Sequence, residues 1–531
     1  CGLYVPNVAL YQAEPHADIL FIFLLLFQDT VHHTIFTTNC QCLYYNIFSL
    51  SDTIVSIIVH KRKAAKPMKS KITNMTAGSP SRLILLFALP LMVGNVFQQL
   101  YTVIDTMVVG QALGVPALAA LGATDWLNWL FTGLIQGFAQ GFSIQMSQEF
   151  GSGNYKRLRK VIFNSLILSA ICSLLVLVTS QACAKPILTL LHTPDDIIGN
   201  SLLYLRIIFL GMPIIMAYNL SASILRSLGD SKTPLHAMIA ASITNIVLDL
   251  IFVLLFHWGI AGAAIATLLA QLLSSVYCFY FIRRIEILKT SRDELVMEKD
   301  LSGRLLLLSF PIAFQNTVIF IGGMIVQSVV NGFGVIFIAG LTATNKLYGV
   351  LESAATSYGY SMSTYAGQNL GAGDLKRIRS GVRSALWIAL ATSVTISTCT
   401  LLLGRNILMW FLSGTPEETA AALQIAYHYL TIMSLFLPTL YLLYIIRSTL
   451  QGTGDTFMPF ISGIAEFAMR VSAALILPRF FGQEGIFYAE ILAWMGADVI
   501  LLGAYFFHVS VWKKQLDQKI DHRQDQSGTK Q

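Results

Sequence analysis

Two aspartates, Asp105 and Asp249, lie within long apolar stretches of the sequence, at 82–110 and 234–257. An ionised carboxylate costs about 3 kcal/mol or more at the centre of a membrane-spanning helix, so such a group is a candidate functional residue. Burial also allows a carboxylate to exchange protons near neutral pH. The alternative is that each aspartate is a structural anchor, satisfied by neighbouring helices and without a transport role.

Polar residues at helical spacing accompany both aspartates. Asn245 lies four residues before Asp249, and Tyr101 lies four residues before Asp105, so each pair shares a helical face. The oxygen atoms of such groups suit a proton relay and a hard cation such as Na⁺ equally well. We expect one coupling site in the first half of the chain, formed by Asp105, Asp249, Asn245, Tyr101, Thr267 and Asn219. Bound Na⁺ would contact Asp105, Asn245, Asp249 and Thr267, and no structural metal or other cofactor is expected.

The composition indicates a membrane protein. Of the 531 residues, 55% are hydrophobic and only 12% are charged, whereas soluble domains carry about 25% charged residues. The net charge of +7 resides largely in Lys and Arg of short interhelical turns, so it indicates topology rather than nucleic-acid binding. The seven cysteines have no metal-site spacing.

Twelve apolar segments are long enough to span a bilayer. Prolines at 90, 213, 311 and 438 should interrupt four of them. The segments are 82–110, 117–149, 158–183, 197–226, 234–257, 260–283, 304–330, 336–368, 378–404, 418–447, 457–480 and 485–511. Lys and Arg gather in every second turn, which predicts that both termini are cytoplasmic.

The two halves of the chain are copies. The stretch 148–160, QEFGSGNYKRLRK, recurs at 368–380 as QNLGAGDLKRIRS, and the turn 223–234, SILRSLGDSKTP, recurs at 448–459 as STLQGTGDTFMP. We interpret the GD pairs of the second motif as helix-end elements rather than ligands. Six spans in each copy give a parallel repeat, with a site between the halves. The predicted fold is therefore an all-α polytopic membrane protein with twelve transmembrane helices in two six-helix bundles, related by a pseudo-twofold axis along the membrane normal.

The expected domains follow from this repeat. Residues 68–285 form an N-lobe, 286–303 a cytoplasmic connector, 304–512 a C-lobe and 513–531 a polar cytoplasmic tail. Residues 1–67 have no methionine and only a nine-residue apolar run, too short to span a bilayer. We interpret them as upstream sequence outside the natural protein; the alternative is a poorly ordered extension.

These motifs resemble the multidrug and toxic compound extrusion (MATE) transporters over residues 75–512, most closely the DinF-like and MepA-like branch. The resemblance rests on 90–114, PLMVGNVFQQLYTVIDTMVVGQALG, on both repeated turns and on 245–252, NIVLDLIF. It implies two six-helix bundles around a V-shaped cavity and drug export driven by inward H⁺ or Na⁺. It also implies that Asp105, Asn245 and Asp249 form the cation site, with Thr267 where that branch has its sixth-span threonine.

The second half departs from the pattern. Arg470 and Ala474 occupy the positions equivalent to Asn245 and Asp249, so coupling should depend on the first half. Glu466 and Arg470 are four residues apart and are predicted to form an ion pair. Three residues are weaker candidates for the substrate cavity: Glu352, Gln98 and Gln315.

The predicted function is secondary-active efflux of amphipathic organic cations, such as drugs or dyes, by H⁺ or Na⁺ antiport with alternating access. No phosphate-binding loop or zinc-protease motif is present in the sequence, so no enzyme is expected. The alternative is a flippase for lipid-linked saccharides, which should line its cavity with Lys and Arg. We expect a multi-pass protein of a prokaryotic plasma membrane, embedded in the lipid bilayer, without nucleic-acid partners and active as a monomer.

Overall fold

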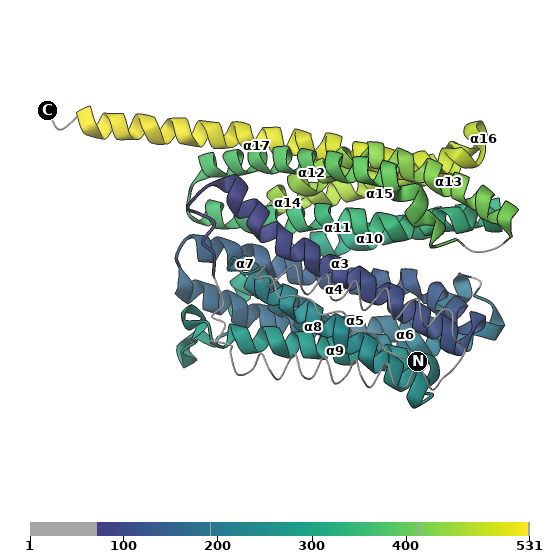
Figure 1. The fold of residues 1–531 in the computed structure, drawn as a ribbon. Coiled ribbons are helices and arrows are strands. Elements are labelled where there is room, and N and C mark those ends of the chain that lie inside the picture. Colours follow the sequence, from purple (N-terminus) through teal and green to yellow (C-terminus); the bar gives the residue numbers. More distant parts are fainter. Residues whose placement is uncertain (1–71, 192, 413–414, 529–531) are drawn as a thin grey trace, which may run out of the picture. The chain divides into compact units, whose positions relative to one another are not determined.

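The computed structural model describes residues 72–191, 193–412 and 415–528, and in these residues the chain is helical without β-strands. The prediction for residues 1–67 lies outside the described residues. Figure 1 shows the helices of the first half, in purple to teal, beside those of the second half, in green to yellow. We call these two bundles the N-lobe and the C-lobe.

The N-lobe contains six successive spans, and two of them are irregular. A bend of 49° separates α6 from α7, and a π-helix continues α8. The helices are α3 Pro80–Leu113, α4 Val115–Gly151, α5 Tyr155–Leu190, α6 Asp195–Leu210, α7 Met212–Ser227, α8 Lys232–Asp249 with the π-helix η1 Leu250–Leu255, and α9 Gly259–Ile282.

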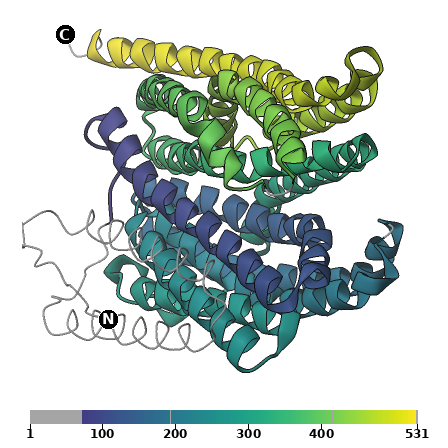
Figure 2. The same ribbon diagram turned by 45° about the vertical axis from the view of Figure 1, so that its right-hand side comes forward.

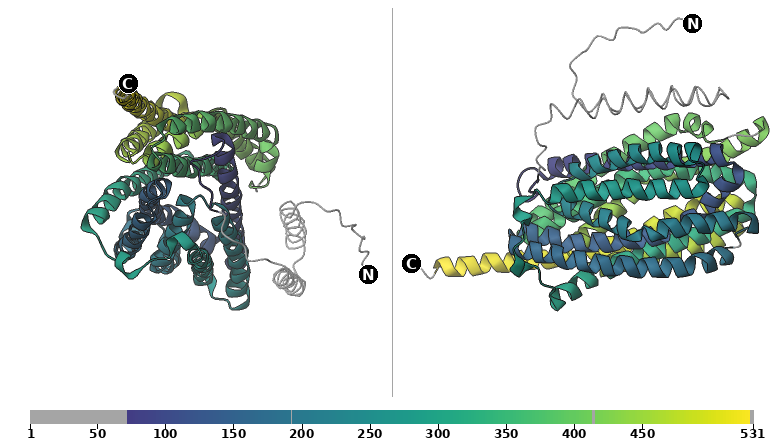
Figure 3. Two further views of the ribbon diagram at one scale, coloured as in Figure 1. Left: turned by 90° about the vertical axis from the view of Figure 1, so that its left-hand side faces the viewer. Right: turned by 90° about the horizontal axis from the view of Figure 1, so that it is seen from below.

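The C-lobe repeats this order, with a matching bend of 49° between α13 and α14. Its helices are α10 Lys299–Val330, α11 Val335–Gly371, α12 Leu375–Met409, α13 Pro416–Leu435, α14 Leu437–Gly452, α15 Phe457–Ile476, α16 Pro478–Phe481 and α17 Ala489–Gly528. The short helices are η2 Glu286–Leu288 and η3 Arg292–Glu294 in the connector, η4 Asn331–Phe333 and η5 Gly482–Tyr488. The tail expected at 513–531 continues α17 as helix to Gly528, past the ends of its neighbours (Figures 1 and 3).

The described chain contains the twelve predicted spans when each bent pair counts as one span and the segment Phe457–Lys514 counts as two. Seven segments of the described chain are long and apolar enough to cross a membrane, and the two bent pairs raise this number to nine. One of the seven, Phe457–Lys514, contains both α15 and α17. The long helices α4 and α11 complete the set. They pack against both lobes, so less of their surface has to be apolar.

The four prolines act in two ways. Pro213 and Pro438 occupy the first turns of α7 and α14, directly after the two bends. Pro90 and Pro311 remain inside continuous helices. The prediction of four interrupted spans is therefore wrong for α3 and α10, where the helix continues through the proline.

The lobes meet along α4 and α10, and glycines allow their backbones to approach. Gly137 and Gly141 lie four residues apart on α4, and a Cβ atom on either would collide with the backbone of α10 at Ala313 or Ser309. Small residues at this spacing are typical of tight helix packing in membranes. Figure 2 shows α3, in purple, running along the boundary between the two bundles.

Equivalent asparagines of the two repeats hold the lobes together. Asn95 on α3 donates to Ser357 Oγ on α11 at 3.3 Å, and Asn316 on α10 donates to the carbonyl of Gly133 on α4 at 2.9 Å. Each bond thus joins the first helix of one lobe to the second helix of the other. This reciprocity is what a pseudo-twofold relation between the lobes requires.

Candidate functional site

Asp249 lies where the regular helix α8 ends and the π-helix begins. Beyond it, the Phe256 amide donates to the Ile251 carbonyl, five residues back, at 2.9 Å. His257 then adopts a left-handed conformation with φ 54°. Such π-helical turns occur frequently at functional sites, because the extra residue reorients the side chains around it.

Asp105 and Asp249 face each other across α3 and α8. The two helices pack against each other, and the two carboxyl groups interact electrostatically. Asp249 is 0% exposed and Asp105 is 8% exposed. Both oxygens of Asp249 and the Oδ1 of Asp105 have no hydrogen-bond partner among the described residues. Since buried acceptors are normally paired, this pair is suited to hold a proton or a cation.

The amide of Asn245 extends the site toward α9. Its Nδ2 donates to the Thr267 hydroxyl at 3.4 Å, while its Oδ1 is buried without a partner among the described residues. The site thus combines two carboxylates with an amide oxygen and a hydroxyl, which are the ligand types of hard cations. A proton shared by the two carboxyl groups would likewise give their unpartnered oxygens a partner.

The remaining two predicted residues differ in position. Tyr101 on α3 interacts electrostatically with both Asp105 and Asp249. Asn219 uses its amide within its own helix, where Nδ2 donates to the Ile215 carbonyl at 2.9 Å. The structure therefore brings Tyr101 to the carboxylates and gives Asn219 no hydrogen bond to them.

Sequence reasoning missed two further groups in this region. Asp125 on α4 is a third carboxylate of the N-lobe spans, and it acts electrostatically on Asp105 and is acted on by Lys346 of α11. Tyr204 on α6 is buried and interacts with Asp105, Asp125 and Asp249. The charge of Asp125 could have been found by scanning the second span for acidic residues, whereas a single tyrosine in an apolar helix carries no such signal.

The C-lobe contains a different kind of charge cluster. Glu466 on α15 accepts from Arg447 of α14 at 2.6 Å and from Arg470 at 3.0 Å. Arg470 also donates to Glu490 at 2.7 Å and to the Ile319 carbonyl of α10 at 3.2 Å. The predicted pairing of Glu466 with Arg470 is confirmed. Glu466, unlike the N-lobe aspartates, has its charge neutralised by arginine.

The weaker candidates for the substrate cavity occupy separate places. Glu352 on α11 accepts from the Tyr444 hydroxyl of α14 at 2.7 Å. Gln315 is 2% exposed and bonded at both ends of its amide, to the Pro459 carbonyl at 2.8 Å and to Gln451 at 3.1 Å. Gln98 on α3 is half-buried beside Tyr101.

The two repeated turns meet at one end of the bundle, here called the basic end, where the turns after α4 and α11 lie. Gln148 of α4 donates to the Gly452 carbonyl at the end of α14, at 3.1 Å. Its counterpart Gln368 of α11 donates to the Ser227 carbonyl at the end of α7, at 2.8 Å. Each glutamine therefore binds the helix end that precedes the second repeated turn of the opposite lobe.

Close backbone contacts seal the basic end. A Cβ atom on Gly151 would overlap the carbonyl of Gln368, and one on Gly371 would overlap that of Gln148. The two ends of α11 also differ in burial. Tyr365 near the basic end is 0% exposed, whereas Val335 at the opposite end is 81% exposed. The lobes are thus closed against each other at the basic end.

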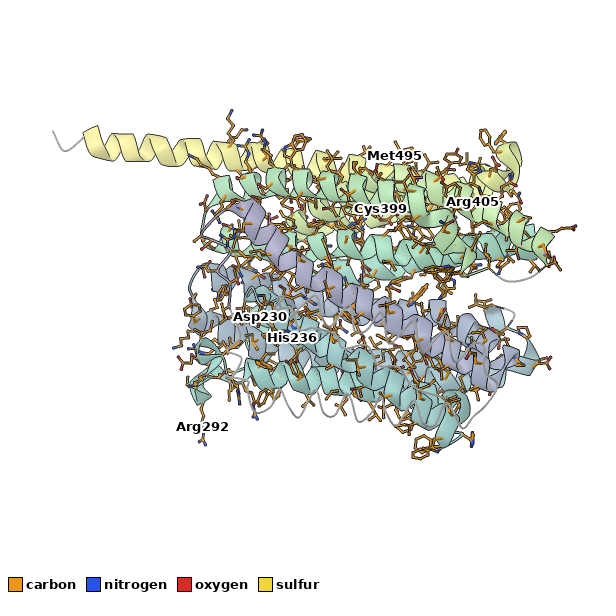
Figure 4. The ribbon with its side chains drawn as sticks, in the orientation of Figure 1. Asp230, His236, Arg292, Cys399, Arg405 and Met495 are labelled. Atoms are coloured by element: carbon orange, nitrogen blue, oxygen red, sulfur yellow. The ribbon has the colours of Figure 1, made fainter. Side chains whose placement is uncertain are left out.

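The aspartates of the second repeated turn cap helices. Asp230 Oδ1 accepts from the Thr233 amide at 3.0 Å at the start of α8, where Figure 4 labels it. Asp455 Oδ1 accepts from the Met458 amide at 3.1 Å at the start of α15. Their interpretation as helix-end elements is confirmed.

The connector between the lobes binds the basic turn of the N-lobe. Arg159 of α5 forms two bonds to Glu294, at 2.6 Å and 2.5 Å, and Lys160 pairs with Glu298 at 2.5 Å. The bond from Arg159 lowers the pKa of the Glu294 carboxyl to about 2. This carboxylate therefore stays ionised at every physiological pH.

Comparison with known proteins finds matches in both lobes. The MatE family profile matches residues 90–251 and 311–476, one segment in each lobe. The chain is 29% identical over 445 residues, 81% of its length and 94% of the relative, to the "Probable multidrug resistance protein YoeA" of Bacillus subtilis. It is 21% identical to the "Multidrug export protein MepA" of Staphylococcus saprophyticus, with 77% of this chain and 89% of the relative covered.

Solved structures share the fold. The structure titled "Outward-facing conformation of a multidrug resistance MATE family transporter of the MOP superfamily" superposes with a TM-score of 0.77 at 22% identity, covering 84% of this chain and 99% of that one. The predicted fold class, twelve transmembrane helices in two six-helix bundles, is confirmed.

Proposed function

Because this chain belongs to the MatE family of membrane transporters, we propose that it exports amphipathic organic cations by antiport against H⁺ or Na⁺. The observation that carries the proposal is the buried pair of Asp105 and Asp249 with unpartnered oxygens. An antiporter needs a group whose proton or ion occupancy differs between its two facing states. These carboxylates, unlike Glu466 of the C-lobe, have no arginine bonded to them among the described residues.

The proposed cycle uses the sealed basic end. Positive turns mark the cytoplasmic side of a membrane protein, so we place the basic end and both termini in the cytoplasm of a prokaryote. The state with the basic end closed then faces outward. Loading of Asp105 and Asp249 from outside removes their mutual repulsion, repacks α3 against α8 and expels the drug. Opening of the basic end discharges the ion inward.

The charge distribution supports cationic cargo. Asp105, Asp125 and Asp249 in the N-lobe spans attract positively charged, amphipathic molecules. Glu352 and Gln98 remain our candidates for cargo contacts, and the fully bonded amide of Gln315 makes it the weakest of the three. The transporter functions as a monomer in this proposal, since one chain supplies both lobes.

The flippase alternative is not favoured. A pyrophosphate cargo requires basic groups inside the cavity, between the lobes, that are free to bind it. The buried arginines of the C-lobe, Arg447 and Arg470, are both bonded to Glu466.

Ethidium efflux from cells that express the full chain tests the proposal. The parent should pump, and Asp249→Asn at equal membrane abundance should not, because the amide can neither carry the proton nor supply the charge. Collapsing the H⁺ and Na⁺ gradients separately names the ion, since only one collapse should stop the parent. Unchanged efflux by the variant would contradict the site, and absence of efflux by a correctly inserted parent would contradict the cargo.

A further inference from the structure

A groove of about 740 Å³ lies between α12 and α17 of the C-lobe, near the basic end. Its rim carries three cations of α12: Lys376, Arg379 and Arg383. They follow one another at spacings of three and four residues, so they lie on one face of the helix and span about 10 Å along it.

The same face continues into an apolar wall. Trp387 and Leu390 come one and two turns after Arg383, and Phe506 of α17 lies on the opposite side of the groove. Trp387 and Phe506 are each 64% exposed. The groove is therefore cationic near the basic end and apolar further along α12.

The three cations have no counterion among the residues whose side chains the structure describes. None of Lys376, Arg379 and Arg383 has an ion pair or a hydrogen bond to another described residue. All three are exposed, and Tyr505 of α17 is the aromatic group on which Arg379 acts electrostatically. A cluster of like charges in one groove is destabilising unless an anion joins it.

At the equivalent position of the N-lobe, the basic residues are paired with carboxylates. Arg159 of α5 is the repeat counterpart of Arg379, at the offset that relates Gln148 to Gln368. The connector supplies Glu294 to Arg159 and Glu298 to the neighbouring Lys160. The described part of the C-lobe supplies no carboxylate to Arg379. The position that a chain segment fills in one lobe is thus left for an external anion in the other.

We propose that this groove binds an anionic phospholipid of the cytoplasmic leaflet, with its phosphate among Lys376, Arg379 and Arg383 and its acyl chains along Trp387, Leu390 and Phe506. The leaflet rests on the orientation proposed above, and the binding itself does not depend on drug transport. A lipid fits better than a soluble anion because the cations and the apolar wall form one continuous surface. Basic pockets between transmembrane helices on the cytoplasmic side are typical sites for anionic lipid headgroups.

Thermal unfolding of the purified full chain in detergent, titrated with phosphatidylglycerol or with phosphatidylcholine, tests this site. Phosphatidylglycerol should raise the melting temperature of the parent more than phosphatidylcholine does. In Arg379→Gln/Arg383→Gln the half-saturating concentration of phosphatidylglycerol should rise about 30-fold, since each basic residue near anionic lipid contributes about a factor of five in affinity.

The matched control is Lys289→Gln/Arg292→Gln, which removes the same charge from the connector. Figure 4 shows Arg292 projecting away from the helices. This variant should bind phosphatidylglycerol like the parent. An equal loss of phosphatidylglycerol affinity in the control would show a general charge effect. An equal rise in melting temperature with inorganic phosphate would show a site for soluble anions. If phosphatidylglycerol and phosphatidylcholine raise the melting temperature of the parent equally, there is no such site. Each of these results overturns the proposal.

Fluorescence quenching by brominated phosphatidylglycerol provides a second readout that does not depend on the stability of the double variant. Trp387 should contribute a quenched component in the parent, and Trp387→Phe should remove that component. Identical quenching curves for the two proteins would contradict the placement of the acyl chains.

Discussion

The two lobes share one fold but differ in the buried charge that they carry at equivalent positions of α8 and α15. In the N-lobe, Asp249 follows Asn245 on the same face and has no hydrogen-bond partner for its oxygens among the described residues. In the C-lobe, Arg470 stands at the position of Asn245, and Ala474 stands at that of Asp249. At these positions one copy of the repeat carries a carboxylate without a hydrogen-bond partner among the described residues, and the other carries an ion-pair cluster.

We expect this difference to separate the residues needed for transport from those needed for stability. A charge that must change during a transport cycle cannot be held by a permanent counterion, because an ion pair of that kind favours one charge state throughout. A cluster that only holds helices together needs such counterions, since unpaired buried charge is strongly destabilising. The lobes can thus be told apart by measuring efflux and stability in matched variants.

The largest expected effect is on the efflux rate, when one buried carboxylate in each lobe is replaced by an amide. Asp105→Asn should lower the efflux rate about 100-fold, because the remaining carboxyl group loses its partner for the proton or ion. Asp498→Asn, in which a buried C-lobe carboxylate without a hydrogen-bond partner among the described residues is changed in the same way, should pump within about twofold of the parent. Transport assays at matched expression check both, and a reversed order would contradict the division between the lobes.

The C-lobe cluster should dominate stability. Glu466→Gln leaves Arg447 and Arg470 with reduced neutralisation, and removal of one partner of a buried pair costs about 3–5 kcal/mol. The melting temperature of the purified protein should fall strongly, and Glu466→Gln/Arg470→Met should recover much of the loss. Asp249→Asn should leave the melting temperature unchanged or raise it, because it removes an unpartnered charge. A larger fall in melting temperature for Asp249→Asn than for Glu466→Gln would contradict this difference between the lobes.

The seal at the basic end should respond to a single methyl group. Gly371→Ala places a Cβ atom against the carbonyl of Gln148, so the closed state should become less populated and efflux should fall about tenfold. Gly122→Ala on α4 meets open space and is the control. Labelling of Ser147→Cys by an impermeant maleimide from the cytoplasmic side should increase only with Gly371→Ala. Equal labelling in both backgrounds would argue against the seal.

The smallest expected effect concerns the connector. Glu294 has its pKa lowered to about 2 by Arg159, so the ion pair contributes fully above the ordinary glutamate pKa of about 4.3 and is lost only as the pH falls through 2. Hydrogen exchange in 286–298, corrected for the intrinsic pH dependence, should therefore be the same at pH 5 and pH 8. Arg159→Gln should raise the exchange rate at both pH values. Faster exchange of the parent at pH 5 than at pH 8 would contradict the role of the Arg159–Glu294 ion pair.

The sequence was sufficient for the features that depend on local spacing and on the repeat. The pairs 148–160 and 368–380 indicated two equivalent halves, and the structure brings their glutamines to opposite lobes at one end. Asn245 and Thr267 meet as predicted, because both lie on the neighbouring helices α8 and α9.

Features that depend on how distant helices cross were not predictable. Tyr204 of α6 interacts electrostatically with the carboxylates, and Lys346 of α11 acts in the same way on Asp125. No sequence spacing encodes either interaction. The bond from Arg447 to Glu466 likewise joins α14 to α15. The π-helix after Asp249 has no signature in the run LIFVLL, which would suit a regular helix equally well.

The most direct test of the N-lobe site is the stoichiometry of ion release on drug binding. Purified full-length protein in weakly buffered detergent solution is mixed with tetraphenylphosphonium, while released protons and bound ²²Na⁺ are measured. The parent and Asp498→Asn should release one of these ions as the drug binds, and Asp249→Asn should release neither. If Asp249→Asn releases the same ion in the same amount as the parent, the coupling site does not lie at Asp105 and Asp249.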